Sequence, residues 1–596
     1  MEVPVLSLLL HHWPAQETSL HTNARGTRAA TSPHPISLQA NMIQGIIMNV
    51  IRPSLRYILA SLLIIVMGSC GGDDGTGPSE FPGDTQGSLA VTLLMIGADL
   101  DTDGCTVSLD SGAAQRVMPG DTLIYSDLEA GTHSVTVGDV KDNCTLLSGN
   151  PRNVTVTAGD TTFQHFTVEC TAIFPPEIAD WLKVNAAPFN TADLSQQPTD
   201  FSDLTYLKDA IGSARVVGLG EATHGTREFF QMKHRVLALL VKELGFNTFA
   251  IEATWPEANR INDYLHTGVG DPQTLLSGLY FWTWNTEEVL EMIQWMRNHN
   301  LNPGGAPQVS FFGFDMQYPG MAIHNVILFL QPIDAAGATF ATDRYSCMQA
   351  YANDPRGSFP AAYADASATY QNTCRDDLDE VYDWLLANRG TLEAASSTQE
   401  FARALRSARV VVQYEDMAAE RTPWARDLYM TENAIWLHEQ AGPGSKVVLW
   451  AHNLHVSEIT GWMGSHLRAH YANDYVIVGF DFYRGSFQAV TLTDTGYGPL
   501  IPHSVGPPPP HSYEYYFHGA EMPRLTLDLR GITFDSPATS WLAGPRDFRS
   551  IGAVFRPSSP QLFFYQARLP QEYDVIIYFD QTAAAVGLPY NPPDNW

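Results

Sequence analysis

The chain has 596 residues, with 34 Lys and Arg against 64 Asp and Glu, so its net charge is −30 when the histidines are neutral. Contacts to nucleic-acid phosphates require Lys and Arg, so a chain this acidic is not expected to bind nucleic acid. The charge indicates little about the fold. The length suits two to four domains.

The N-terminal residues 1–69 are predicted to be a signal or leader region. Arginines precede an apolar run at 57–67, which is too short to span a bilayer as a helix, and small residues then lead to Cys70. This order is typical of a secretory signal, and the cysteine after the small residues resembles the lipobox of bacterial lipoproteins. We therefore expect an exported protein that is lipid-anchored to a bacterial membrane through Cys70, with Met42 or Met48 as the true start. The alternative is an ordinary signal peptide in which this cysteine is incidental.

The cysteines agree with export, because an oxidising compartment permits disulfides. Cys347 and Cys374 lie together in one region and form a natural pair. Among Cys105, Cys144 and Cys170, a Cys144–Cys170 pair is favoured, which would leave Cys105 outside a disulfide. The spacings contain no Cys-x-x-Cys and therefore do not favour a cysteine metal site.

Two segments precede the main body of the chain. Residues 70–86 are rich in Gly, Pro and Asp and are predicted to be a flexible tether. Residues 87–172 contain short strand candidates separated by turn signals, which predicts a small all-β sandwich. This module carries no catalytic cluster, so we expect a spacer or a surface-adhesion module. The strand candidates are 88–95, 105–109, 122–125, 132–137, 152–157 and 163–168.

From 173 to 596 strands alternate with helices, which predicts an α/β catalytic domain with a mainly parallel sheet and helices on both faces. A helix is expected at 228–244 with Gly245 at its C-terminal end, and Thr286 is expected to cap a second helix. Residues 316–445 are mostly helical in pattern and are interpreted as a helical insertion over the ligand edge of the sheet. No segment of this body is long and apolar enough to span a membrane. The buried strand candidates are 214–219, 247–251, 309–314, 446–450, 475–480 and 575–579.

Ionisable side chains stand at or just after the ends of four of these strands. They are Glu221 and His224 after the first, Glu252 at the second, Asp315 at the third, and His452 and His455 after the fourth. The carboxyl ends of parallel strands share one edge, so these residues are predicted to meet in one crevice. Each alone could be a cap or an ion-pair partner, as Glu252 would be if it paired with Lys233 or Arg260. Together they indicate a functional site, because clustered ionisable groups in a crevice are costly without a task.

Three chemistries could use this cluster. A neutral imidazole held by a carboxylate could take a proton from water, and the same carboxylates and histidines could instead bind a metal ion. Dinucleotide binding is the third, because Gly218-x-Gly220 follows a strand, but Thr223 stands where its fingerprint needs a third glycine. The sequence has no Gly-x-Ser-x-Gly nucleophile elbow, so a serine esterase is not favoured.

At these residues the chain resembles the erythromycin esterase family, and the resemblance covers roughly 180–596. The matching segments are Gly218-Leu-Gly-Glu-Ala-Thr-His-Gly-Thr226, Phe249-Ala-Ile-Glu-Ala-Thr-Trp-Pro-Glu257, Arg426-Asp-Leu-Tyr-Met-Thr-Glu-Asn433 and Trp450-Ala-His-Asn-Leu-His-Val456. The resemblance implies hydrolysis of a macrolactone or related ester with no metal or other cofactor, and with it macrolide resistance.

The resemblance also implies roles for individual residues. His224 matches the general base, and Glu221, Glu252, His452 and His455 match the essential groups around it. Lys233 falls where the family carries a basic residue, and Arg426 could contact an anion or the substrate.

A mechanism from the residues agrees with these roles. His224, oriented by Glu221 or Glu252, would deprotonate a water, and His452 or His455 would stabilise the oxyanion or protonate the leaving alkoxide. Asp315 would support the cluster, and nearby aromatic residues such as Trp255 and Trp284 could give a large ester an apolar wall. The rival interpretations are a metal-dependent hydrolase of another substrate and a non-enzymatic, surface-binding lipoprotein.

Overall fold

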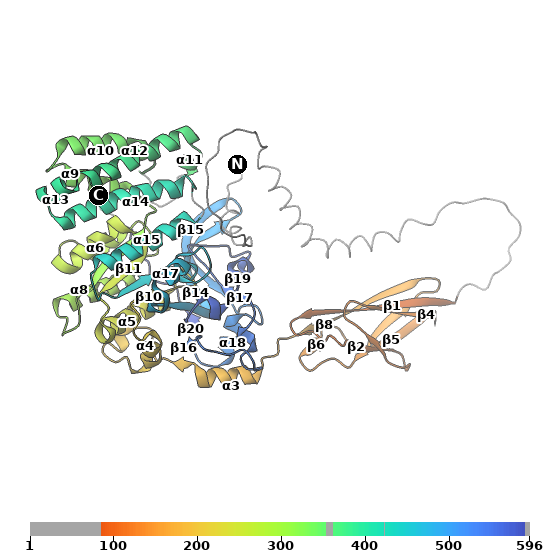
Figure 1. Cartoon of the computed structure of the whole chain (residues 1–596). Helices are drawn as coiled ribbons and strands as arrows, with labels where there is room; N and C mark the ends of the chain where they lie inside the picture. Colours follow the sequence, from red (N-terminus) through yellow and green to blue (C-terminus); the bar gives the residue numbers. More distant parts are fainter. Residues whose placement is uncertain (1–84, 353–360, 422–423, 591–596) are drawn as a thin grey trace, which may run out of the picture. The chain divides into compact units, whose positions relative to one another are not determined.

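The computed structural model describes residues 85–352, 361–421 and 424–590 (Figure 1). The predicted signal region, Cys70 and nearly all of the tether lie outside these ranges. Within them, no helix is both long and apolar enough to cross a membrane. The chain divides into two compact units, of which the smaller includes residues 104–139 and the larger includes the described residues from 167 onward.

The N-terminal part is all-β, as predicted, and forms two four-stranded sheets with the orders β4-β1-β8-β6 and β3-β2-β5-β7. Fully buried apolar residues such as Leu89 and Val107 fill its interior. A disulfide joins Cys144 to Cys170, and buried Cys105 takes part in no disulfide. The strands are β1 (Gln86–Gly97), β2 (Cys105–Leu109), β3 (Gln115–Val117), β4 (Thr122–Glu129), β5 (Gly131–Gly138), β6 (Cys144–Leu146), β7 (Arg152–Val156) and β8 (Thr161–Cys170).

The larger part is built on a ten-stranded sheet whose main path runs β12-β11-β13-β10-β14-β20-β16-β9. Its first six strands pair in parallel, whereas β16 pairs antiparallel with both β20 and β9. The predicted mainly parallel sheet is therefore confirmed. The strand β15 pairs antiparallel with β14, and β18 pairs parallel with it. The strands are β9 (Ala187–Pro188), β10 (Val216–Leu219), β11 (Thr248–Thr254), β12 (Ser310–Asp315), β13 (Val447–Trp450), β14 (Tyr475–Thr493), β15 (Gly496–Val505), β16 (Arg524–Asp528), β18 (Val554–Phe555) and β20 (Val575–Thr582), and β17 (Arg546–Arg549) pairs with β19 (Phe564–Ala567) outside this sheet.

Helices cover both faces of the sheet. Successive strand residues point to opposite faces and belong to two different hydrophobic clusters. Val216 and Leu449 belong to one cluster, and Val217 and Val448 belong to the other. The helices of the first part are α3 (Pro176–Asn185), α4 (Thr205–Ile211), α5 (Arg227–Leu244), α6 (Trp255–Thr267), α7 (Pro272–Ser277) and α8 (Glu287–Leu301). The later short helices are α16 (Asn453–Val456), α17 (Met463–Tyr471), α18 (Tyr513–Gly519) and α19 (Leu569–Glu572).

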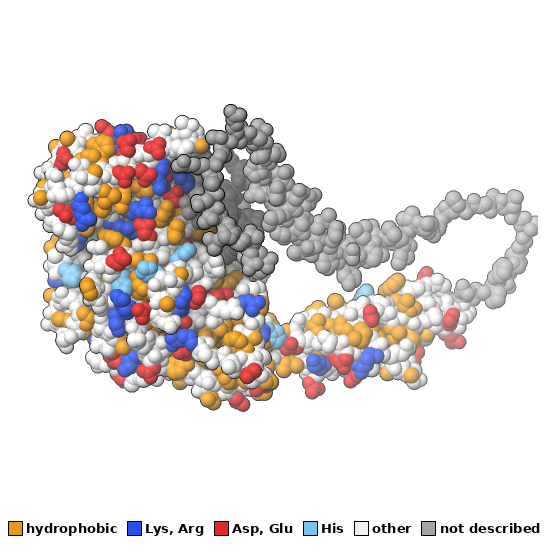
Figure 2. All heavy atoms as spheres, in the orientation of Figure 1, with side chains coloured by type: hydrophobic (Ala, Val, Ile, Leu, Met, Phe, Trp, Pro, Cys, Tyr) orange, Lys and Arg blue, Asp and Glu red, His pale blue; other side chains and the backbone are white. Residues whose placement is uncertain are grey.

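The predicted insertion is built of helices joined by short connections in its described residues, and it packs into the first of these clusters (Figure 1). The disulfide between Cys347 and Cys374 ties α10 to α12, as predicted. Charged side chains of both signs are scattered over the face shown in Figure 2. The helices are α9 (Gly320–Leu330), α10 (Ala335–Ala352), α11 (Ala361–Ala364), α12 (Ala368–Ala387), α13 (Arg389–Ala395), α14 (Thr398–Ala418) and α15 (Ala425–Gln440).

Local signals placed two helix ends correctly. Gly245 ends α5 with a φ of 74°, a left-handed conformation that favours glycine. The Thr286 side chain accepts a hydrogen bond from the backbone N–H of Val289 at 3.3 Å and caps α8. Two strands run further than predicted: β11 continues through Glu252, and β14 continues through Asp481, both of which are buried.

Candidate active site

Four neighbouring strands place the predicted ionisable residues at one edge of the sheet. The order β12-β11-β13-β10 brings together Asp315, Glu252, His452 and Glu221, which lie in or directly follow these strands. Glu221 and Asp315 are fully buried, and His452 is 6% exposed. The convergence expected from the parallel strands is therefore observed.

The His224 imidazole is held by Glu221 and not by Glu252. Its Nδ1 lies 2.6 Å from Glu221 Oε1. The other carboxylate oxygen accepts a hydrogen bond from Lys233 Nζ at 2.5 Å and one from Trp450 Nε1 at 2.6 Å. With Nδ1–H donating to the carboxylate, Nε2 of His224 is left as a base nitrogen.

Glu221 stays ionised although it is buried. Burial alone would raise its pKa, but the Lys233 charge and the hydrogen bond from His224 outweigh burial and lower it. Burial lowers the pKa of Lys233 to about 8 against the opposing charge of Glu221. The ammonium lies 4.3 Å from the centre of the Trp450 ring, a cation–π contact. A carboxylate in this position stabilises the imidazolium that forms when His224 takes a proton.

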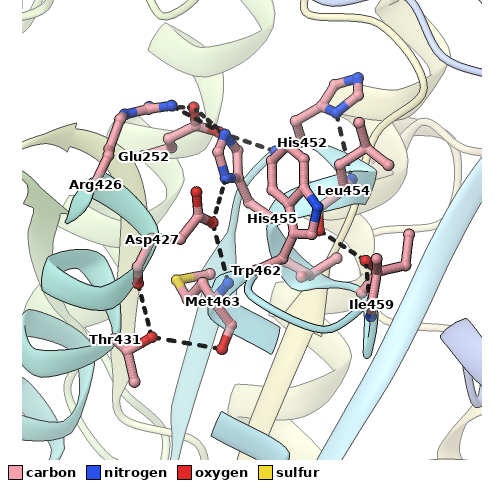
Figure 3. Close-up of polar contacts among 12 residues, drawn as sticks. Glu252, Arg426, Asp427, Thr431, His452, Leu454, His455, Ile459, Trp462 and Met463 are labelled. Atoms are coloured by element: carbon pink, nitrogen blue, oxygen red, sulfur yellow. Dashed lines mark hydrogen bonds and ion pairs between the residues drawn. The ribbon is translucent and has the colours of Figure 1, made fainter. Parts of the chain in front are cut away.

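A second network surrounds Arg426 (Figure 3). Its Nη2 lies 2.5 Å from Glu252 Oε1 and 2.8 Å from Asp315 Oδ2, and its Nη1 lies 3.0 Å from His455 Nε2. On its other side, His455 Nδ1 lies 2.7 Å from Asp427 Oδ1. In this structure Arg426 therefore binds the carboxylates of Glu252 and Asp315, and its contact with a bound anion or the substrate stays a prediction.

The charges of this network shift the pKa values of its members. Burial would lower the pKa of His455, but the carboxylates of Asp427 and Glu252 raise it. Burial would raise the pKa of Glu252, but the His455 and Arg426 charges hold it well below its usual range. Glu252 is thus an ionised group that fixes its neighbours, and its Oε2 accepts the backbone N–H of His452 at 2.9 Å.

His452 lies between the two networks. Its ring centre is 5.2 Å from that of His224, and its Nδ1 accepts the backbone N–H of Leu454 at 3.3 Å. In Figure 3 the ring points away from Glu252 and Arg426. Burial, followed by the neighbouring imidazoles of His224 and His455, lowers its pKa to about 3. His452 is therefore neutral at ordinary pH, and its Nε2–H, which has no partner among the described residues, can serve as a hydrogen-bond donor.

The prediction that Trp255 and Trp284 give the substrate an apolar wall is wrong, because both side chains are buried. Trp255 and Trp284 are each 2% exposed, so neither presents a free wall to a substrate. Trp284 packs edge-on against Trp450 at 5.0 Å and thereby supports the tryptophan that binds Glu221. The exposed aromatic beside the cluster is Trp424, which is 43% exposed and lies 5.9 Å from Trp462.

Sequence reasoning missed two residues of the site. Asp427 orients His455 and also accepts the backbone N–H of Met463 at 3.0 Å, and Trp450 is a hydrogen-bond donor to Glu221. Both lie inside the segments that carry the family resemblance. Asp427 directly follows Arg426 and Trp450 ends an apolar strand, so position in those segments was the only signal that could have singled them out.

The geometry also bears on the two alternative chemistries, metal-ion binding and dinucleotide binding. Among the described residues, no group of three or more His, Cys, Asp or Glu is arranged to hold a metal ion. Protein N–H donors already occupy the oxygens of Glu221 and Glu252. Gly220 lies so close to Asn453 that a Cβ would be 2.2 Å from its Oδ1, so this glycine permits close packing and does not form a phosphate loop.

The erythromycin esterase family model matches residues 241–582, more than half of the chain, and the chain therefore belongs to the erythromycin esterase family, a family of hydrolases. The putative hydrolase YbfO of Bacillus subtilis (strain 168) is 22% identical over 434 residues, covering 68% of this chain and 91% of that protein. Erythromycin esterase type II of Escherichia coli is 24% identical over 436 residues, covering 68% and 98%.

Solved structures show the same fold. A Bacillus cereus protein of 26% identity has a TM-score of 0.59, covering 70% of this chain and 99% of its own. A mutant of the erythromycin esterase EreC in its open conformation has 17% identity and a TM-score of 0.52, covering 67% and 99%.

Proposed function

We propose that the protein hydrolyses a carboxylic ester of the macrolactone class by general-base activation of water at His224. The observation that carries this proposal is the imidazole whose Nδ1 is held by an ionised, buried Glu221. This arrangement leaves Nε2 as the base and compensates the positive charge that forms on it. His224 is 15% exposed, whereas Glu221 is fully buried, so the base is the member of the pair that a water can reach.

Space for the attacking water is provided by a glycine. A Cβ at Gly552 would lie 4.0 Å from His224 Nε2 and 3.9 Å from Cδ2, so a side chain there would occupy the position next to the base. Gly552 does not have a positive φ, which makes the missing side chain, and not backbone strain, the reason for glycine at this position.

The chemistry proceeds in two steps. His224 Nε2 takes a proton from water while the water oxygen bonds to the ester carbonyl carbon, and the carbonyl oxygen becomes an oxyanion. The Nε2–H of neutral His452, 5.2 Å away between ring centres, donates a hydrogen bond to that oxyanion. The carbon–oxygen bond to the alcohol then breaks, and the His224 imidazolium returns its proton to the departing alkoxide. The products are a carboxylic acid and an alcohol.

A macrolide as substrate, with antibiotic resistance as its consequence, is the finer part of the proposal. It is supported by relatives that are named erythromycin esterases. The test is turnover of erythromycin and a panel of lactones and esters, measured by mass spectrometry with the full chain from Cys70. His224→Ala should abolish turnover, whereas His165→Ala, at an exposed histidine of the β part, should not. Turnover that a chelator removes would favour a metal-dependent hydrolase, and absence of turnover with every ester would refute the proposal.

Membrane attachment through a lipid on Cys70 and export remain part of the proposal, supported by the sequence around that cysteine. Expression in a bacterial host with a lipoprotein-processing pathway should place the protein in the membrane fraction. Cys70→Ala should release it into the soluble fraction. Equal membrane association of both forms would contradict the lipid anchor.

A further inference from the structure

A pocket of about 350 Å³ lies beside the segment that faces the catalytic base. Both ends of this segment, Arg549 and Phe555, line the pocket. In its middle, the backbone N–H of Ile551 donates to the carbonyl of Ala222 at 2.7 Å, and Gly552 faces His224. The pocket's other lining includes Ser504, Phe564 and the run Pro507, Pro508 and Pro509.

Arg549 is a buried cation without an ion pair in the described part of the chain. It is 2% exposed, and its Nε has no hydrogen-bond partner there. Its Nη2 donates only to backbone carbonyls, at 3.1 Å to Tyr483 and 3.4 Å to Gly506. The guanidinium carbon lies 4.7 Å from the centre of the Phe564 ring. A buried donor without a partner is costly, so the orphaned Nε–H of a guanidinium that lines a pocket indicates that an acceptor group of a ligand completes it.

Burial lowers the pKa of Arg549, and the charges of the nearby carboxyl groups of Glu514 and Asp481 oppose this effect. Asp481 and Glu514 are fully buried, and neither forms an ion pair with the Arg549 guanidinium. Burial raises the pKa of both, and the proximity of Glu514 raises that of Asp481 further.

We propose that this pocket is a binding site for an organic monoanion, namely a carboxylate on an aromatic or aliphatic body. Arg549 is the only charged residue of the lining, which suits one negative charge, and its planar fork matches a carboxylate. The prolines and the rings of Phe555 and Phe564 provide an apolar surface for the body of the ligand. The volume lies within the range of small-molecule sites. The proposal is independent of the proposed hydrolysis.

The test is calorimetric titration of the full chain with benzoate, with benzamide and inorganic phosphate as probes that lack either the charge or the apolar body. Benzoate should bind at one site, at least tenfold more tightly than either control. Arg549→Gln should weaken benzoate binding at least tenfold, and Arg556→Gln, which removes a partly exposed cation outside the lining, should not.

Two further variants distinguish benzoate binding in this pocket from the effect of a folding defect and from binding at the catalytic cluster. Ser504→Trp places a large side chain in the pocket from an exposed position, so it should block benzoate even if Arg549→Gln does not fold. His224→Ala should leave benzoate binding unchanged. Absence of benzoate binding, or binding that persists in Ser504→Trp, would overturn the proposal.

Discussion

Replacing Glu221 by Gln is expected to remove catalysis and to destabilise the fold for two separable reasons. Glu221 accepts three hydrogen bonds, from His224 on one oxygen and from Lys233 and Trp450 on the other. Glutamine has a single oxygen. If that oxygen faces Lys233 and Trp450, the amide NH₂ faces His224 Nδ1 and forces the tautomer with hydrogen on Nε2, which cannot act as a base. If the amide is turned round, its NH₂ opposes two donors.

The magnitudes follow from burial. Lys233 is fully buried, and Glu221 is the only carboxylate that it contacts among the described residues. Removing one partner of a buried ion pair destabilises a protein by about 3–5 kcal/mol. A wrong tautomer at the base of a hydrolytic triad lowers kcat by about 10⁴-fold in proteases. We expect losses of both sizes in Glu221→Gln.

The assay is a double-mutant cycle with Lys233→Met, followed by urea unfolding and by turnover of the best ester in the panel. Because Lys233→Met removes the stranded charge, the double variant should be more stable than the sum of the two single losses predicts, with a coupling of about 1–3 kcal/mol. It should not regain activity, because the carboxylate that orients His224 is still absent. Additive free energies of unfolding, or activity within tenfold of wild type in Glu221→Gln, would refute the reasoning.

Three further changes test the second network and the loop beside the base. Asp427→Asn should lower the raised pKa of His455, which NMR titration of its ring measures. The loss in free energy of unfolding should be greatest below about pH 6.5 and should shrink as the pH rises through the pKa of His455 in the folded protein. A loss that does not depend on pH would contradict this. Arg426→Lys removes the planar guanidinium that joins the carboxylates of Glu252 and Asp315, and it should lower the free energy of unfolding by about 1.5–3 kcal/mol. A change below roughly 0.5 kcal/mol, the size expected of a surface substitution, would contradict this expectation. Gly552→Ala should lower kcat at least about tenfold with unchanged unfolding, whereas Gly544→Ala, whose Cβ meets nothing within 4 Å, should change neither.

The sequence predicted most of the sheet because its central strands are short, continuous apolar runs that end at a polar residue. The runs before Glu221, Asp315 and His452 were each placed to within two or three residues. The same rule ended two strands too early, at Glu252 and Asp481. A buried charged residue inside a strand cannot be distinguished from a strand end by pattern alone, because its partners come from distant segments.

The predicted disulfides and helix ends were also correct. Cys347–Cys374 and Cys144–Cys170 are both present, and Thr286 and Gly245 end helices as expected. These features depend on local chemistry or on nearness in the sequence. Sequence alone could therefore specify them.

What the sequence determined by itself was the set of chemical groups and the edge of the sheet at which they meet. The tertiary structure alone decided which group binds which. It assigned His224 to Glu221, paired Glu252 with Arg426 and not with Lys233 or Arg260, and brought Asp427 to His455. The physical reason is that hydrogen bonds and ion pairs act over about 3 Å. Contacts between side chains from strands and helices far apart in the chain depend on sheet order and helix docking, which no local pattern encodes.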